Sequence, residues 1–320
     1  MKMTMIGRGK SRLNVFSYEN NRRIKRGGFW GLIFGLVFVA FTPLRAEHLP
    51  ESRSLNKRNS ENLILMTVPK SGTHLMAKLI YLMTGQKSHA LWTVFGEKTN
   101  NLSPEIHPEY FIGKLDHCFK KNKPVHAHLN YGDLVQDYID DCHKKIKQAP
   151  KVAVLVRDPR DIYVSLTHFI YEPLKRAMGG SPSFDEVLLW TIHNGYGEHE
   201  GGKWDIPWFL DKLQEWVDRP GTVLFRFEEL CGQCGGGSRE AQFAAFHRLG
   251  RLLDIELTER ECILMSKELF GKSQQGISWT FRSGQIGSWK EHFKPEHIDA
   301  FKEELGEVLI KLGYEDDYDW

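Results

Sequence analysis

Residues 62–75 read NLILMTVPKSGTHL, and this stretch decides the fold. Asn62–Val68 is a short apolar run that is typical of a buried strand. A helix is expected over Thr73–Thr84, because apolar residues recur on one side of it and Gly85 follows as a stop. The loop between them gathers the first amides of that helix, and the positive end of its dipole, around one point. The stretch therefore predicts a strand–loop–helix unit that binds phosphate or sulfate.

Strands and helices alternate through the rest of the chain. Further strands are expected at Pro124–Leu129, Lys151–Arg157 and Thr222–Phe227. Helices are expected at Pro159–Arg176, Ser183–Asn194, Ser238–Phe270 and Pro295–Leu312. This order predicts an α/β fold with a parallel β-sheet flanked by helices on both faces. Ligands of such sheets bind outside the carboxyl ends of the strands, so the site is expected there.

Five consecutive residues of the first loop are candidates to bind the anion, namely Lys70, Ser71, Gly72, Thr73 and His74. Gly72 lets the backbone approach an oxyanion, Lys70 adds a mobile cation, and Thr73 adds a hydroxyl. A P-loop nucleoside triphosphatase would carry GxxxxGK followed by Ser or Thr, and the chain contains no such string. The loop is therefore expected to work without the usual magnesium arrangement, and no metal is expected.

A second anion site is expected where the strand Lys151–Arg157 ends. Arg157 can donate two hydrogen bonds to a phosphate. Ser165 lies about two helical turns further along, and its hydroxyl can add a third. An ordinary salt-bridge cluster of Arg157, Asp158, Arg160 and Asp161 at the strand end is the alternative interpretation.

These two motifs resemble those of the sulfotransferase family. TVPKSGTHL is similar to the family's YPKSGTTW loop, which holds the 5′-phosphosulfate of 3′-phosphoadenosine-5′-phosphosulfate (PAPS), and Arg157 with Ser165 is similar to its 3′-phosphate motif. A third segment, FRSGQIGSWK, resembles the RKGxxGDWK segment that closes over the nucleotide. The resemblance adds four nucleotide-binding candidates: Phe281, Arg282, Ser283 and Gly284.

The resemblance also has departures. Ser283 replaces a Lys of the family pattern and Ser288 replaces an Asp, while His74 and Leu75 replace a Thr and a Trp. The resemblance implies a P-loop-like sulfotransferase fold over residues 61–320, with PAPS as the sulfuryl donor. A non-catalytic nucleotide-binding module and a P-loop kinase-like enzyme are the alternative functions, and the departures are the best support for the non-catalytic one.

Sulfuryl transfer needs a base near the acceptor and a cation near the leaving oxygen. Lys70 is the candidate cation. His126 and His128 lie on one face of their strand by alternation, and His128 matches the histidine of the family's T-H-L-P string, so it is the expected base. Two structural histidines or an HxH metal pair are the alternatives. Phe227, in a string similar to the family's R-Y-E-D-L, is expected either near the adenine or simply in the core.

The N-terminal part of the chain is interpreted as a targeting segment. Residues 1–60 contain twelve Lys or Arg and only three acidic residues. Residues 1–26 are expected to form a basic leader within this part. Residues 27–46 are apolar enough for a signal-anchor or signal peptide, and 47–60 resemble a linker. The expected arrangement is a single-pass anchor with the leader in the cytoplasm and the domain in a lumen or periplasm. Cleavage would give a secreted protein, while an inverted anchor and a buried core helix are the alternatives.

Charge and cysteine content limit the partners. The chain beyond residue 60 carries 31 basic against 38 acidic residues, which argues against nucleic acid as a partner. Cys231 and Cys234 have CxxC spacing, which fits a redox pair, half a zinc site or two thiols on a flexible loop. The acceptor is expected to be a small molecule, a glycan or a peptide. Its pocket is expected in residues 86–120 and 171–208, which follow no recognised pattern.

Overall fold

The computed structural model describes residues 62–91, 108–128, 150–177, 182–195, 215–270 and 282–320, with a few single positions and short pairs between them. All of them belong to the unit Phe41–Trp320. The expected leader, apolar segment and linker (1–60) lie outside the described residues, as does Phe281. In the described part of the chain, no helix is both long and apolar enough to cross a membrane.

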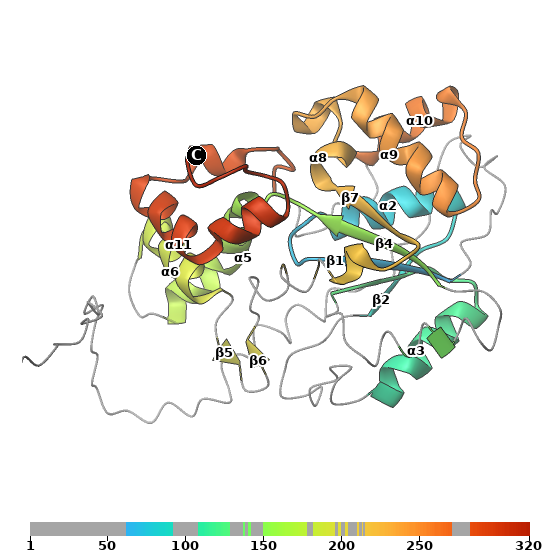
Figure 1. Cartoon of the computed structure of the whole chain (residues 1–320), viewed down its shortest axis with the longest axis horizontal. Helices are drawn as coiled ribbons and strands as arrows, with labels where there is room; N and C mark the ends of the chain where they lie inside the picture. The colour runs from blue at the N-terminus through green and yellow to red at the C-terminus, as the bar shows by residue number, and fades with distance from the viewer. Residues whose placement is uncertain are drawn as a thin grey trace, which may run out of the picture. The chain divides into compact units, whose positions relative to one another are not determined.

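A five-stranded parallel sheet forms the centre of the described domain, as the sequence predicts (Figure 1). Its order is β2-β3-β1-β4-β7. The strands are β1 Leu63–Thr67, β2 His89–Leu91, β3 Val125–Ala127, β4 Lys151–Val156 and β7 Thr222–Arg226. The central strand β1 pairs with β3 on one side and β4 on the other, and all five of its residues are buried. A separate antiparallel pair consists of β5 Glu198–His199 and β6 Gly202–Lys203.

One face of the sheet is covered by α2 Thr73–Thr84, α9 Arg239–Leu252 and α10 Glu259–Leu269. Leu63 and Leu65 of β1 belong to this core, while the alternate residues Ile64 and Met66 belong to the core on the other face. A parallel strand covered on both faces must be apolar on both sides, which accounts for the uninterrupted run LILM.

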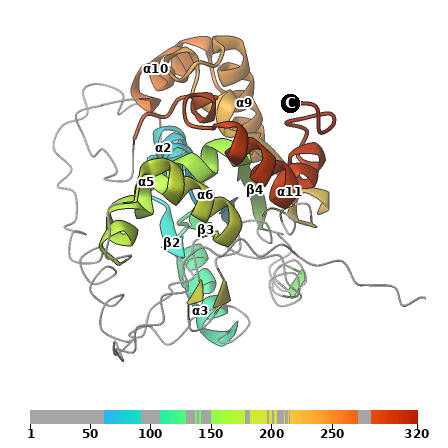
Figure 2. The same ribbon diagram turned by 90° about the vertical axis from the view of Figure 1, so that its left-hand side faces the viewer.

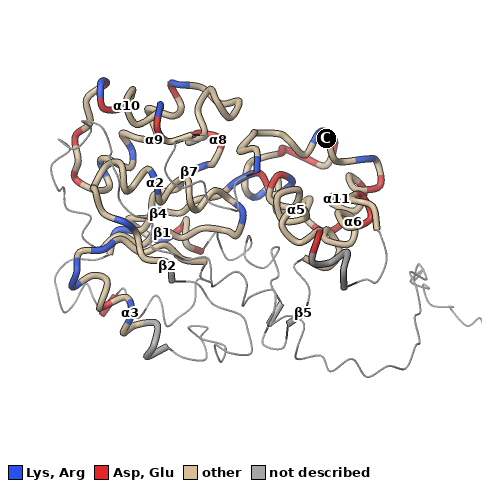
Figure 3. The backbone as a smooth tube through the Cα atoms, turned by 180° about the vertical axis from the view of Figure 1, so that it is seen from behind, with Lys and Arg blue, Asp and Glu red and all other residues tan. Residues whose placement is uncertain are grey.

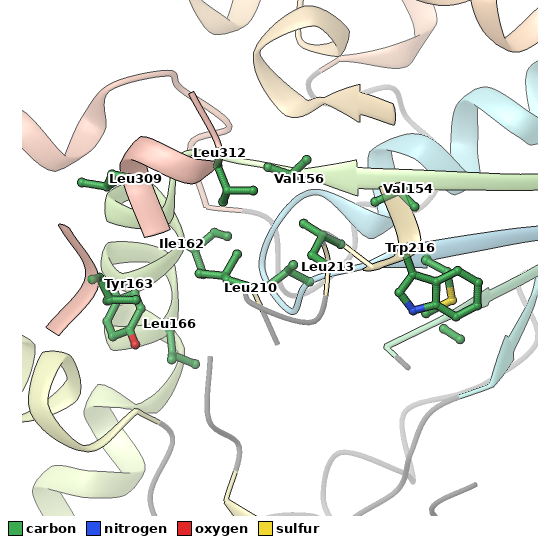
Figure 4. Close-up of a cluster of buried hydrophobic side chains, with 14 of the residues drawn as sticks. Val154, Val156, Ile162, Tyr163, Leu166, Leu210, Leu213, Trp216, Leu309 and Leu312 are labelled. Carbon is green, nitrogen blue, oxygen red and sulfur yellow. The ribbon is translucent and has the colours of Figure 1, made fainter. Parts of the chain in front are cut away.

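The other core is built with α3 Pro108–Lys120, α5 Pro159–Ala177, α6 Phe184–Asn194 and α11 Pro295–Lys311. Helix α6 packs against both α5 and α11 (Figure 2). Figure 4 shows how the core continues past the end of β4: Val154 and Val156 lie in the same cluster as Ile162 of α5 and Leu309 of α11. The helices predicted on both faces are thus confirmed.

Local signals place the ends of several elements. Gly85 adopts a left-handed conformation (φ 70°) and ends α2, while Ser183 and Glu186 form the expected capping box at the start of α6. Two expectations need correction. Phe227 does not end a strand but begins the short helix α8 Phe227–Leu230, and residues 86–120, in which no recognised pattern was found, contain β2 and α3.

Candidate nucleotide-binding and catalytic site

The predicted site residues come together at the carboxyl ends of three adjacent strands. Lys70 follows β1, His128 follows β3 and Arg157 follows β4. The two strands beside β1 are held in register with it, with Thr67 opposite Leu155 and Met66 opposite Ala127. The sheet therefore brings into one place three side chains that are far apart in the sequence.

The loop after β1 is a tight turn with two residues in the left-handed region. Lys70 has φ 68° and Gly72 has φ 103°. The hydroxyl of Ser71 donates to the carbonyl oxygens of Val68 at 2.7 Å and Leu155 at 3.3 Å. Ser71 is fully buried, and its hydroxyl fastens the loop to β4. Its side chain shapes the turn, while the helix that follows offers its first amides at the open side.

Lys70, Arg157 and Arg282 form a cation cluster around this turn. Burial, together with the nearby guanidinium groups of Arg157 and Arg282, lowers the pKa of Lys70 to about 8. Burial and Arg157 also lower the pKa of Arg282. The Lys70 ammonium lies 4.3 Å from the centre of the Phe169 ring. Like charges held together at a strand end are what an anionic ligand would stabilise.

Arg157 is 5% exposed and is held from several sides. Its Nη2 atom donates to the Gln285 carbonyl oxygen at 2.9 Å, and its Nη1 atom lies 3.5 Å from the Lys70 carbonyl oxygen. Asp161 forms an ion pair with it at 3.4 Å. The buried Nε atom of Arg157 has no hydrogen-bond partner among the described residues. A buried donor left in this state is suited to an incoming acceptor such as a phosphate oxygen.

Phe227 lies between the two predicted phosphate sites. Its ring is 4.3 Å from the guanidinium carbon of Arg157, and a Cβ atom built on Gly72 would lie only 2.6 Å from its Cδ2 atom. The side chain is 4% exposed. Phe227 therefore belongs to the core and lies against both Gly72 and Arg157, while its place near the adenine stays a prediction.

Thr67 fixes the orientation of the His128 ring through contacts to its Nδ1 atom. Its Nδ1 atom lies 2.7 Å from the Thr67 carbonyl oxygen and 3.0 Å from the Thr67 hydroxyl. A carbonyl can only accept, so Nδ1 carries the proton and Nε2 is left as the basic atom. The Thr67 hydroxyl also lies 2.8 Å from the hydroxyl of Thr73. Burial is the main cause that lowers the pKa of His128 to about 4, so the ring is neutral near pH 7.

The other histidines of the site are neutral for similar reasons. His126 is 7% exposed and contacts the Ser88 hydroxyl at 2.8 Å, and burial lowers its pKa to about 3, with smaller contributions from His74 and His128. Partial enclosure and the Lys70 ammonium lower the pKa of His74. His74 contributes to the lowered pKa of both His126 and His128, so both rings lie near it. Within the described ranges, no group of three or more His, Cys, Asp or Glu residues could hold a metal ion.

The alternative salt-bridge cluster after β4 is also present. Arg160 pairs with Asp158 at 2.8 Å and with Glu315, while Arg157 pairs with Asp161. Basic and acidic positions lie next to each other where β4 runs into α5 (Figure 3). Arg160 is neutralised by two carboxylates, whereas Arg157 has one ion-pair partner among the described residues and also belongs to the cation cluster, so its role in an anion site stays a prediction.

The C-terminal segment reaches the same place. Gln285 accepts from Arg157, and Arg282 donates to the Ser288 hydroxyl at 3.0 Å. Ser283 has a buried hydroxyl with no hydrogen-bond partner among the described residues. Gly284 has φ 64°, which favours glycine. Ser165 is half-buried on α5, two turns beyond Arg157.

Two site features escaped the sequence reasoning. Asp161 was considered only as part of a salt-bridge cluster, although a carboxylate in the first turn of α5, four residues after Arg157, is close enough in sequence to suggest an ion pair. Gln285 contributes a backbone carbonyl oxygen, which no side-chain pattern reveals.

Cys231 and Cys234 of the CxxC pair form no disulfide, and among the described residues they belong to no group that could hold a metal ion. Cys231 and Cys234 are both free; Cys231 is buried and Cys234 is exposed. Burial raises the pKa of Cys231 to about 12. The loop that contains them packs on the C-terminal segment, because Gln285 donates to the Cys234 carbonyl oxygen at 3.0 Å and Ile286 to that of Gly235 at 2.9 Å. The interpretation as two thiols on a loop fits these contacts best.

Comparison with known proteins agrees with this geometry. A family model described as the sulfotransferase domain matches residues 60–230. Similar proteins include a flavonol sulfotransferase-like protein from Flaveria bidentis, 23% identical over 80% of this chain and 84% of that protein. Sulfotransferase 2A1 from Homo sapiens is 24% identical over 87% of this chain and 95% of that protein. The crystal structure of mouse sulfotransferase SULT7A1 complexed with PAP superposes with a TM-score of 0.52 and 18% identity, covering 86% of this chain and 94% of that one.

Proposed function

The chain belongs to the sulfotransferase domain family and is a sulfotransferase, and we propose that it moves a sulfuryl group from PAPS to an acceptor hydroxyl or amine. We propose that the acceptor is a small molecule, a glycan or a peptide. The observation that carries the choice of donor is the cation cluster of Lys70, Arg157 and Arg282, in which the Nε atom of Arg157 is buried without a partner among the described residues. Such a cluster fits a ligand with two anionic ends.

The described residues fit the donor at both ends. Lys70, Gly72, Thr73 and the first turn of α2 would hold the 5′-phosphosulfate, with His74 beside them. Arg157, Ser165, Arg282, Ser283 and Gly284 would hold the 3′-phosphate, with Phe227 between the two ends. The buried Ser283 hydroxyl lacks a partner among the described residues, and this supports the same assignment. Phe281 is proposed with this group on the resemblance alone.

PAPS supplies the sulfuryl group and a nucleotide leaving group when it is bound. His128 takes the proton from the acceptor at Nε2, because its Nδ1 proton is held by Thr67 and burial keeps the ring neutral. Lys70, as an ammonium, would stabilise the negative charge that develops on the leaving oxygen. No metal is needed for either role.

Radiolabelled PAPS and a panel of phenols, sugars and tyrosine peptides test this function. Replacing Lys70 by Ala is expected to lower kcat/KM by about 10²–10³, and replacing His128 by Ala by about 10²–10⁴. Lys151→Ala and His193→Ala are the matched controls, because Lys151 pairs with Asp254 and His193 with Glu304 at the surface. Transfer that both site variants leave unchanged would refute the proposed roles.

We also propose that residues 27–46 form a single-pass signal-anchor that places the enzyme domain in a lumen or periplasm, or a signal peptide whose cleavage releases it. The apolar composition of this segment and the basic leader before it support this. Protease protection of a C-terminal tag on the full chain, in sealed vesicles from expressing cells, tests the orientation. Protection that detergent abolishes is expected; digestion without detergent would contradict it.

A further inference from the structure

Asp161 is a fully buried carboxylate that joins two parts of the site. It lies in the first turn of α5, and its exposed fraction is 0%. Its Oδ2 atom accepts from the Gly287 amide at 2.9 Å. Its Oδ1 atom accepts from the Trp289 amide at 2.9 Å and from the Ser288 hydroxyl at 3.1 Å. One side chain thus fastens the turn 287–289 to α5, more than a hundred residues away in the sequence.

The same carboxylate reaches both guanidinium groups of the site. Arg157 forms an ion pair with its Oδ2 atom at 3.4 Å. Arg282 reaches it indirectly, because its Nη2 atom lies 3.0 Å from the Ser288 hydroxyl, which in turn donates to Asp161. The Ser288 hydroxyl can accept from Arg282 and donate to Asp161 at once. Asp161 therefore sits behind the two arginines on which the 3′-phosphate assignment rests.

We propose that Asp161, with Ser288 as its relay to Arg282, is a positioning residue that sets Arg157 and Arg282 to grip the 3′-phosphate of the donor. This inference rests on the proposed function. Two guanidinium groups repel each other, so a carboxylate that pairs directly with Arg157 and reaches Arg282 through Ser288 fixes their spacing before the ligand arrives. Asp161 itself touches no phosphate, and its effect passes through the two arginines.

Asp158 provides a contrast on the same turn of chain. It is also buried, at 7% exposed, but it pairs with Arg160 at 2.8 Å and not with the cation cluster. Removing either carboxylate breaks a buried ion pair and should lower the melting temperature. A change in recognition of the 3′-phosphate is expected for Asp161 alone.

Calorimetric binding of two nucleotides to the full chain tests the proposal: adenosine 3′,5′-bisphosphate and adenosine 5′-monophosphate, which lacks the 3′-phosphate. In Asp161→Asn, the Kd of the bisphosphate is expected to rise about tenfold or more while that of the monophosphate stays within about twofold. Ser288→Ala, which loses one hydroxyl and should fold, is expected to shift the same ratio by about threefold. Asp158→Asn should leave the ratio unchanged.

Several results would overturn the proposal. An unchanged ratio between the Kd values of the two nucleotides in both Asp161→Asn and Ser288→Ala, even if both nucleotides bind more weakly, would assign Asp161 a purely structural role. If the unaltered protein itself did not prefer the bisphosphate, the PAPS assignment would fail together with this inference. A preference for the bisphosphate that keeps its full size in both variants would remove the inference and leave the proposed function intact.

Discussion

The guanidinium carbon of Arg160 lies 4.1 Å from the centre of the Trp289 ring, on the turn that Asp161 fastens. Trp320 lies 4.6 Å from the same guanidinium carbon, so Arg160 contacts two indole rings while Asp158 and Glu315 neutralise it. This group, which we call the arginine clasp (Arg160, Trp289, Trp320, Asp158 and Glu315), connects the C-terminal tail after α11 and the turn 287–289 to the start of α5.

Trp320→Ala is expected to lower the free energy of unfolding by about 1–3 kcal/mol, because aromatic packing and a cation–π contact are lost together. Urea unfolding measures the change. Leu264→Ala is the control, since Leu264 is 45% exposed on α10 and should change stability by less than about 0.5 kcal/mol. Equal effects of the two substitutions would show that the arginine clasp contributes no specific stabilisation.

The pH dependence of kcat/KM should follow two groups of the free enzyme. The pKa of His128 is lowered to about 4, so the base is neutral above that pH and is lost as pH falls through it. The pKa of Lys70 is lowered to about 8, so the ammonium is present below that pH and is lost as pH rises through it. A plateau between the two values is therefore expected in initial-rate measurements at low substrate.

The alkaline limb should move when the donor is bound. An anion beside Lys70 favours its charged form and raises its pKa, so the limb for kcat should lie at higher pH than the limb for kcat/KM. His193→Ala should leave both limbs in place, because its ring is exposed and pairs with Glu304. An alkaline limb that lies at the same pH in both profiles would contradict the assignment to Lys70.

Gly72→Ala is expected to weaken donor binding and stability together. The residue has φ 103°, and a Cβ atom there would lie 2.6 Å from Phe227, so both backbone and ring must move. A loss of about 1–3 kcal/mol in unfolding free energy is expected. Gly113→Ala in α3 is the control, because nothing lies within 4 Å of its Cβ position and alanine favours a helix. A Gly72 variant as stable as the Gly113 variant would disprove the predicted clash.

The two CxxC thiols should differ in reactivity. Cys234 is exposed, whereas Cys231 is buried and its pKa is raised to about 12, so little thiolate forms at Cys231. Brief alkylation of the folded protein at pH 8, followed by peptide mass spectrometry, should label Cys234 and spare Cys231. Denaturation should then expose Cys231. Equal labelling of both in the folded protein would favour a reactive pair.

The pattern of elements was largely predictable because its signals are local. The apolar run of β1, the stop at Gly85 and the capping box at Ser183 each lie within a few consecutive residues, and the structure confirms them. β2 was missed because three residues, HAL, carry no strand pattern of their own. Its hydrogen bonds to β3 define it as a strand, and that pairing is a tertiary event.

The candidate site divides in the same way. The motifs around Lys70, Arg157 and Arg282 carried the resemblance to the family, and the alternation of strands and helices predicted a site at the strand ends, because each of these signals lies in a short run of adjacent residues. The tertiary structure alone decided which nitrogen of His128 is basic, that Ser71 braces the loop, and that Asp161 holds the turn 287–289. These depend on burial and on contacts between distant segments, and no local pattern encodes either.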